Sequence, residues 1–257
     1  MMDRYLQLAR PGAGRAGRRA LRSVIGRGLL ACAWIASAWL VWLVQPVQPA
    51  HAADPSQFSE AERQLFVRPH LATVAPPTIL HYRYERTGTL QPEVTDHATL
   101  TLSGDGASRT AAVDFLHDDR RLELPTIDYV EQNPIILHFL EREVRQLKDL
   151  TGGAVNFYRN RIRKALAGEA TVKATRFDYD GRQVDGVEIR IDPYANDPAR
   201  SRFEKFADRY YVMVLSPEVP GEVYQLKAEL PDGSAGARTG AVVHEEVLTF
   251  ERREQGG

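Results

Sequence analysis

The sequence predicts an α+β fold: a curved antiparallel β-sheet of about eight strands, shaped like half of a barrel and covered by a long central helical segment. Three observations predict it. Apolar and polar residues alternate over residues 79–124 and again over 177–250, which is the pattern of strands with one buried face. Over residues 133–167 apolar residues recur every three to four positions, as they do in a helix. Glycine, proline and aspartate turns separate the alternating runs.

The N-terminal segment is typical of an export signal. Residues 1–27 hold seven arginines and one acid, and residues 28–44 form a stretch of 17 residues without a charge. Ala50 and Ala52 then provide the small side chains that a signal peptidase requires, which predicts cleavage before Ala53. The alternative is an uncleaved anchor in the inner membrane, because 17 residues lie at the lower limit of a spanning helix. Either reading places the domain in the periplasm, with membrane contact only through this segment.

Removal of residues 1–52 changes the composition of the chain. It leaves 205 residues with a formal net charge of −7, and it removes Cys32 together with all three tryptophans. The exported protein therefore has no disulfide, no thiol chemistry and no cysteine ligand for a metal. Its acidic charge argues against a nucleic-acid partner.

The remaining chain divides into a short lead-in and one β-rich domain. Residues 53–77 are expected to form a lead-in helix and linker, with Ser59 and Glu62 at capping-box spacing. Residues 78–251 are expected to form a single domain with a helical insertion at 133–167, and residues 252–257 a polar tail. Within the domain, a fourth strand is expected at 122–124.

The helical insertion has clear start and stop signals. Asn133 is a good N-cap and Pro134 a good first helical residue. The apolar stripe predicts that His138, Arg142 and Arg145 lie on the side away from the core. The glycines at 152 and 153 kink or interrupt the helix, so the sequence leaves open whether there is one helix or two.

No chemical motif assigns a catalytic role to any residue. The histidines of the exported chain lack metal-ligand spacing, and there is no G-x-S-x-G nucleophile motif. We therefore expect no metal, no cofactor and no enzyme activity. An enzyme whose site is assembled from residues distant in sequence remains an alternative hypothesis.

Four cations within six residues stand out in an acidic chain: Arg159, Arg161, Arg163 and Lys164. One interpretation is a solvated face near the C-terminal end of a helix, where cations suit the helix dipole. The other is a contact with an anion, a lipid headgroup or an acidic protein of the cell envelope. The second interpretation predicts a docking or assembly protein.

The order of elements over residues 56–251 resembles the periplasmic lipoprotein carriers of the LolA/LolB class, which are half-barrels. The resemblance rests on element order and on no diagnostic motif. It implies a non-catalytic protein that holds a lipid or another apolar ligand between the concave sheet and its helices. The candidate lining residues are Tyr82, Tyr84, Leu100, Val113, Phe115 and Leu140. The same residues would equally form a closed core.

Overall fold

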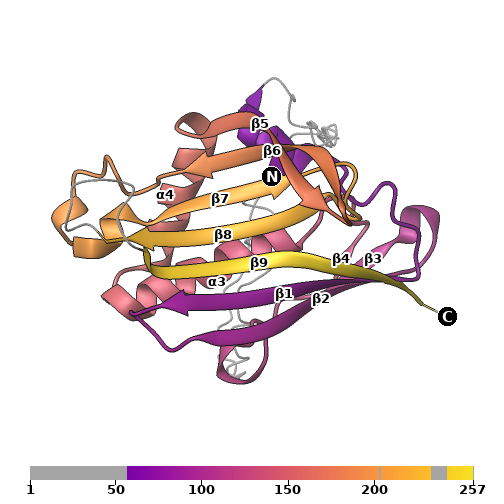
Figure 1. Ribbon diagram of the computed structural model, residues 1–257, viewed down its shortest axis with the longest axis horizontal. Helices are drawn as coiled ribbons and strands as arrows, with labels where there is room; N and C mark the ends of the chain where they lie inside the picture. The colour runs from indigo at the N-terminus through magenta and orange to yellow at the C-terminus, as the bar shows by residue number, and fades with distance from the viewer. Residues whose placement is uncertain (1–56, 203, 233–241, 257) are drawn as a thin grey trace, which may run out of the picture.

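The computed structural model describes residues 57–256 except 203 and 233–241, and its strands form one antiparallel sheet of nine strands. The predicted cleavage site at Ala50, Ala52 and Ala53 lies outside the described residues. The strand order is β4-β3-β2-β1-β9-β8-β7-β6-β5 (Figure 1). The strands are β1 (Thr78–Gly88), β2 (Val94–Ser103), β3 (Thr110–Phe115), β4 (Ile127–Asp128), β5 (Thr171–Tyr179), β6 (Arg182–Ile191), β7 (Tyr210–Leu215), β8 (Val223–Pro231) and β9 (Val242–Gln255).

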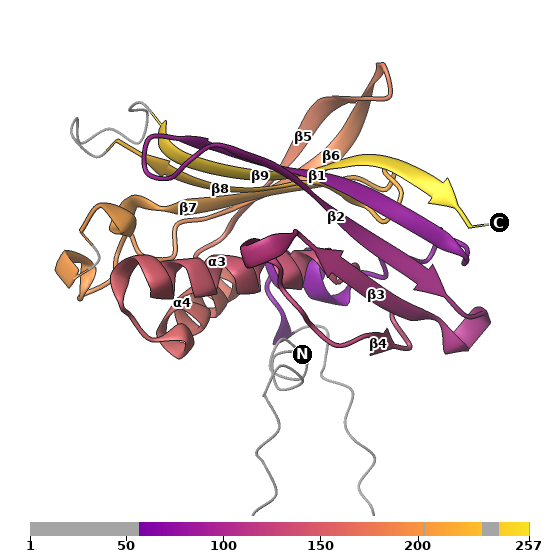
Figure 2. The ribbon, with the colours of Figure 1, turned by 90° about the horizontal axis from the view of Figure 1, so that it is seen from below.

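The sheet is curved and its concave face carries the helices, as Figure 2 shows. This confirms the predicted α+β half-barrel architecture, with nine described strands where the sequence predicted about eight. Two helices occupy the middle of the chain, α3 (Ile135–Thr151) and α4 (Val155–Gly168). α3 packs on β8, and α4 packs on α3 and β6.

The connection of these helices to the sheet explains why they cover it. β4 and β5 are the two opposite edges of the sheet, and the helices lie between them in the sequence. The chain must therefore cross the full width of the sheet between residues 128 and 171. Because a helix with one apolar stripe is most stable with that stripe buried, the crossing follows the concave apolar face.

Gly152 ends α3 and settles the number of helices at two. Its φ of 72° is left-handed, a conformation that glycine adopts without steric cost, and its N–H donates to the carbonyl of Lys148. The N-cap of α3 is Pro134 and the helix begins at Ile135, one residue later than predicted, while Asn133 precedes the cap and its Oδ1 accepts from the backbone N–H of Ile135 at 3.1 Å. Its Nδ2 donates to the hydroxyl of Tyr82 at 2.9 Å, which fixes the start of α3 against β1.

The expectation that His138 and Arg142 face away from the core is wrong. His138 is buried and its ring lies 5.8 Å from that of Phe115 on β3, while Arg142 lies over the ring of Tyr84 on β1. α3 is packed against the protein on more than one side, so the buried part of its surface is wider than its apolar stripe. Arg145 is exposed, as predicted.

Two strand boundaries differ from the prediction. Residues 122–124 form only a single bridge, between Leu122 and Phe115, and the short strand β4 follows instead. Positive φ values at Leu116 (61°) and Asp118 (53°) turn the chain out of register after β3. At the other end of the chain, β9 continues to Gln255 because its last residues pair with β1.

The lead-in segment belongs to the same folded unit. Ser59 and Glu62 form the predicted capping box at the start of α2 (Glu60–Glu62), which runs into the π-helical turn η2 (Arg63–Val67). The hydroxyl of Ser59 also donates to the carbonyl of Leu166 on α4 at 2.7 Å. Leu65 and Phe66 join the main core.

Candidate functional site

The six candidate lining residues lie together in the core under the concave face. Tyr82, Tyr84, Leu100 and Phe115 come from β1, β2 and β3 and are fully buried. Leu140 comes from α3 and is also buried, while Val113 is half-buried and packs against the same cluster. The structure therefore brings all six residues into one apolar cluster, and in this conformation they are part of the packed core.

A buried ionic cluster lies between α3 and the sheet, at a place that the sequence analysis did not identify. We define it by its charged or titratable members. They are Arg142 and Glu143 of α3, Arg209 directly before β7, and His244 and Glu246 of β9. Four of the five side chains are 0% exposed, and Arg142 as a residue is 8% exposed. Ionisable groups are rarely buried so completely unless they are paired.

Arg209 and Glu143 form the central pair of the ionic cluster. Both Nε (3.0 Å) and Nη2 (2.5 Å) of Arg209 donate to Oε2 of Glu143. Nη2 also donates to Oε1 of Gln146, one turn further along α3, at 3.2 Å. The pair thus joins the helix to the sheet through charge-assisted hydrogen bonds.

A second pair joins the same helix to β9. Arg142 donates to the carboxylate of Glu246, and Gln146 Nε2 donates to the other carboxylate oxygen at 2.6 Å. The Nε2 of His244 lies 2.9 Å from that same oxygen. The guanidinium of Arg142 also lies 4.9 Å from the ring centroid of Tyr84, within range of a cation–π interaction.

The two carboxyl groups of the ionic cluster have opposite pKa shifts. Burial, together with the nearby Glu246, raises the pKa of Glu143 above its ordinary value. Burial acts in the same direction on Glu246, but Arg142 and the hydrogen bond from His244 hold its pKa well below the ordinary value. Glu143 is therefore the carboxyl group of the cluster that takes up a proton more readily.

Several buried polar atoms around the ionic cluster have no hydrogen-bond partner within the described residues. They include Nη1 of Arg209, the hydroxyl group of Tyr84 and Nδ1 of His244. The hydroxyl of Tyr211 lies close by, beside Arg209 and Tyr194. Tyr211 follows Arg209 by two residues and is 0% exposed on the concave side of β7. Buried polar atoms without a hydrogen-bond partner are uncommon in folded proteins and call for an explanation.

One sequence signal pointed to part of the ionic cluster. In the strand pattern of residues 242–250, His244 and Glu246 share a face with Leu248 and Phe250, so charged groups stand on an apolar face. Nothing local in the sequence indicated that Arg209, which lies outside any strand or helix, would complete the cluster.

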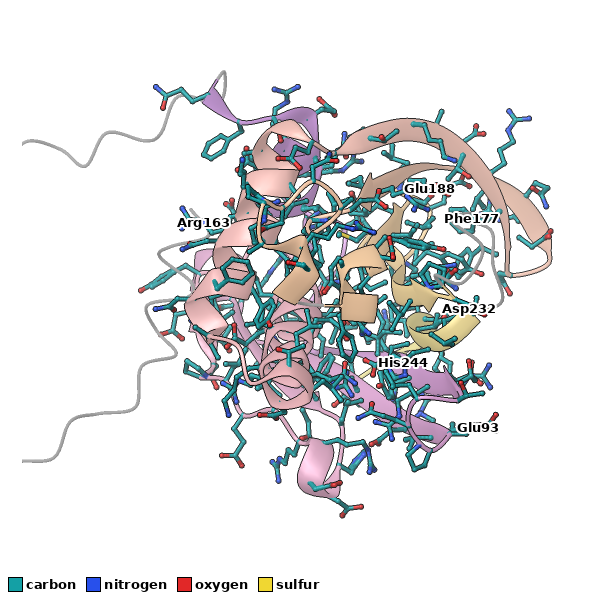
Figure 3. All side chains as sticks on the ribbon, turned by 90° about the vertical axis from the view of Figure 1, so that its left-hand side faces the viewer. Glu93, Arg163, Phe177, Glu188, Asp232 and His244 are labelled. Atoms are coloured by element: carbon teal, nitrogen blue, oxygen red, sulfur yellow. The ribbon has the colours of Figure 1, made fainter. Side chains whose placement is uncertain are left out.

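The four cations of α4 do not form one free surface. Arg159 binds the buried carboxylate of Glu141, with Nε at 2.9 Å. Arg161 donates to the carbonyl of Pro193 and pairs with Asp197 at 2.9 Å. Lys164 is exposed and Arg163 is half-buried on the outer side of the helix layer, where Figure 3 labels it. Arg159 and Arg161 are therefore held by the buried acids Glu141 and Asp197, and the exposed Lys164 lies 3.8 Å from Glu169.

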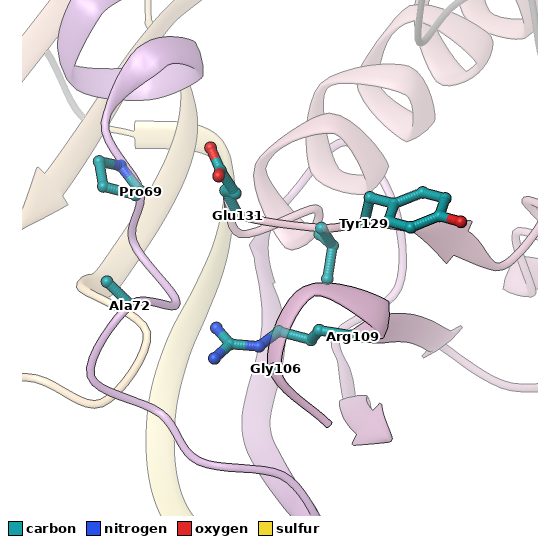
Figure 4. Close-up of a pocket in the computed structure, with 7 residues that line it drawn as sticks. Pro69, Ala72, Gly106, Arg109, Tyr129 and Glu131 are labelled. Carbon is teal, nitrogen blue, oxygen red and sulfur yellow. The ribbon is translucent and has the colours of Figure 1, made fainter. Parts of the chain in front are cut away.

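Two surface pockets lie away from both the apolar cluster and the ionic cluster. One has a volume of about 430 Å³ and is lined by residues that include Arg109, Tyr129 and Glu131 (Figure 4). The other, of about 410 Å³, lies between the tip of the β5–β6 hairpin and the ends of β8 and β9. Neither lining includes any of the six candidate residues or any member of the ionic cluster.

The described part of the chain holds neither a metal-binding cluster nor a membrane-spanning helix. Over residues 57–256, with the gaps given above, no group of three or more histidine, cysteine or acidic side chains is arranged to hold a metal ion. Among these same residues, no helix combines the length and the apolar character needed to cross a membrane.

Comparisons with known proteins show a weak likeness at the level of the fold. No protein-family model and no curated protein matches the chain. Among solved structures, the lipoprotein LppX of Mycobacterium tuberculosis is similar at 11% identity and a TM-score of 0.30, covering 71% of this chain and 89% of that one. A LolA superfamily protein of Nitrosomonas europaea is similar at 8% identity and a TM-score of 0.22, covering 77% of this chain and 94% of that one. The predicted resemblance to LolA-type half-barrels is thus found at the level of fold alone.

Proposed function

We propose that the protein is exported to the periplasm and acts there as a non-catalytic binding or carrier protein for an apolar, lipid-like ligand. The ligand lies between the concave face of the sheet and the helices α3 and α4. The six candidate residues of β1, β2, β3 and α3 form part of its lining.

The observation that carries this proposal is the path of the chain across the sheet. α3 and α4 span the concave face as one insertion between the two edge strands, and they add no strand to the sheet. A helix pair connected in this way is able to move away from the sheet without breaking the sheet's backbone hydrogen bonds. Its movement exposes an apolar face rich in aromatic side chains, which is the surface that an acyl chain requires.

The two alternatives have less support. Docking through the basic helix would use Arg159 and Arg161, which are already bound to Glu141 and Asp197. An enzyme site would use the acids of the ionic cluster, but Glu143 and Glu246 are 0% exposed in this conformation. Only the carrier proposal uses the apolar concave face.

A tryptophan placed in the lining tests the proposal. All three natural tryptophans precede residue 53, so the processed protein has none, and one introduced residue provides the whole signal. We expect a dibrominated stearic acid to quench the fluorescence of Phe115→Trp in protein purified from the periplasm. Lys148→Trp, on the exposed side of α3, is the matched control and should be quenched little. Equal quenching of both variants, or none in Phe115→Trp, contradicts the proposal.

A further inference from the structure

We propose that the ligand carries a carboxylate at its polar end, and that Arg209 and Tyr211 bind this carboxylate in exchange for the side chain of Glu143. The inference rests on the proposed carrier function and adds the chemical class of the ligand, a long-chain fatty acid. In the structure described above, the protein's own carboxylate occupies the position that the ligand's carboxylate takes.

The arrangement of donors supports a second carboxylate acceptor at this place. Glu143 already accepts from Nε and Nη2 of Arg209. Nη1 of the same guanidinium has no hydrogen-bond partner within the described residues, and the hydroxyl of Tyr211 lies beside Arg209 and Tyr194. Both Arg209 and Tyr211 are 0% exposed. An arginine fork binds a carboxylate through two parallel N–H groups, and a neighbouring hydroxyl adds a third donor. The site thus holds more donors than Glu143 satisfies.

Glu143 is placed so that its displacement coincides with ligand entry. It belongs to α3, the helix that covers the concave face, whereas Arg209 and Tyr211 belong to the sheet side. Any movement of α3 that admits an acyl chain also withdraws Glu143 from Arg209. The withdrawal would leave a guanidinium buried without its counter-charge, which is strongly unfavourable unless another anion replaces it. A fatty-acid carboxylate gives Arg209 both a new negative charge and new hydrogen-bond acceptors in the place of those of Glu143.

The charge of the ionic cluster favours an anionic ligand over a neutral one. With Glu143 withdrawn, two guanidinium groups, Arg142 and Arg209, remain beside one carboxylate, Glu246. A ligand with a single negative charge restores neutrality, and an alcohol or ester of the same chain length does not.

The lining beside Arg209 continues as apolar surface. Along β7, Met213 and Leu215 follow Tyr211 on the same face, and Ile189 and Ile191 of β6 lie beside them in register. These side chains are buried. A fatty acid whose head lies at Arg209 therefore meets apolar side chains along its acyl chain.

The test compares oleic acid with oleyl alcohol, which has the same chain and no carboxylate. Binding to the unmodified protein is measured by competition with a fluorescent fatty acid. We expect the acid to bind at least about tenfold more tightly than the alcohol, because a site built for a hydrogen-bonded group rejects an analogue that lacks it.

Two variants locate the carboxylate. Tyr211→Phe removes one donor, and we expect it to weaken oleic acid binding several-fold and to leave oleyl alcohol unchanged. Glu143→Gln removes the competing charge with little change in shape, and we expect it to tighten oleic acid binding. Glu188→Gln is the matched control, since Glu188 of β6 pairs with Lys173 of β5, outside the ionic cluster (Figure 3). A circular dichroism spectrum verifies that each variant is folded.

The outcomes separate this inference from the proposed function. Equal affinity for acid and alcohol, with no effect of Glu143→Gln, overturns the carboxylate assignment and leaves the carrier function standing. An alkyl phosphate of the same length that binds as tightly as the acid also overturns the assignment of a carboxylate. Failure of both amphiphiles to bind overturns the proposed function and this inference together. Weaker acid binding by Glu143→Gln shows that Glu143 supports the site and does not compete for it.

Discussion

The guanidinium of Arg209 and the carboxylate of Glu143 hold the helix layer to the sheet at a position from which solvent is fully excluded. Nε and Nη2 lie 3.0 Å and 2.5 Å from the same carboxylate oxygen, and both side chains are 0% exposed. Removing Arg209 leaves the buried Glu143 only its longer contact with Arg142 at 3.3 Å, whereas removing both charges leaves the neighbouring Arg142–Glu246 pair in place. The two kinds of substitution therefore have different consequences.

Arg209→Met should lower the free energy of unfolding by about 3–5 kcal/mol, because it removes the cation that lies nearest to the buried Glu143 and makes two hydrogen bonds to it. The double variant Arg209→Met/Glu143→Leu should recover most of this loss. Urea unfolding of the single and double variants measures both effects. Arg176→Ala is the control, since its pair with Asp185 is largely exposed and contributes about 1 kcal/mol or less. A single variant as stable as the control would show that the pair does not hold the layers together.

Acid should destabilise the fold through His138. Burial lowers the pKa of this imidazole to about 4, although its hydrogen bond with the Pro134 carbonyl acts in the opposite direction. The histidine of an unfolded chain titrates near 6.5, so the unfolded state binds more protons between pH 6.5 and about 4. Stability is therefore lost as the pH falls through this window, by about 2 kcal/mol at pH 5 from this one residue.

The measurement is urea unfolding at pH 7 and pH 5 of the protein and of His138→Leu. His138→Leu should lose less stability than the unmodified protein between the two pH values. Burial also lowers the pKa of His70 to about 4, so His70 accounts for part of the stability that the variant still loses. His97→Leu serves as the control because that side chain is 55% exposed. If His138→Leu and His97→Leu lose the same stability between pH 7 and pH 5, His138 is not the acid-sensitive group.

Charge reversal on α4 should destabilise the protein at Arg159 and have little effect on stability at Lys164. Arg159→Glu places a second carboxylate beside the buried Glu141 and should destabilise the protein by about 2 kcal/mol or more. Lys164→Glu changes an exposed side chain, so its effect should be within about 0.5 kcal/mol. Thermal unfolding compares the two variants. Equal, small effects would indicate that Glu141 does not hold Arg159, which would leave Arg159 available for a docking contact.

Export through a cleaved signal predicts that Ala50→Asp and Ala52→Asp block processing, because a carboxylate does not fit the small-residue positions of the peptidase site. An immunoblot of cell fractions should show the unprocessed protein in the membrane fraction. Ala53→Ser, after the cleavage point, should be processed normally. A processed band of unchanged size in Ala52→Asp would refute cleavage at this position and favour the anchor or another site.

Most of the fold followed from local patterns. The alternation around Tyr82 and Leu100 predicted β1 and β2. Among the predicted turns of glycine and aspartate, Asp180 and Gly181 join β5 to β6 with positive φ values of 51° and 73°. Gly152 marked the break between α3 and α4. Each of these features depends on the conformational preferences of residues that are neighbours in the sequence. The signal for each one therefore lies within a single short segment.

The candidate site was predicted only in part. The apolar candidates were found because a period of two places them on one face of a strand. The position of Arg142 was predicted wrongly, because the surroundings of a helix depend on what packs against it and not on its own apolar stripe. The length of β9 was also underestimated, because its last residues include no apolar side chain that would indicate a strand. They are held in the strand by the pairing of Glu254 and Gln255 with β1.

The sequence by itself determined that the chain is a β-rich α+β domain behind a basic, apolar N-terminal segment, and which residues form its apolar face. Only the tertiary structure decided that the helices cross from one edge of the sheet to the other, and that five titratable groups meet beneath α3. Glu143 and Arg209 are 66 residues apart, and Arg142 and Glu246 are 104 apart. No local periodicity connects residues at such separations. Their pairing is a consequence of strand order and of the exclusion of water between two packed layers.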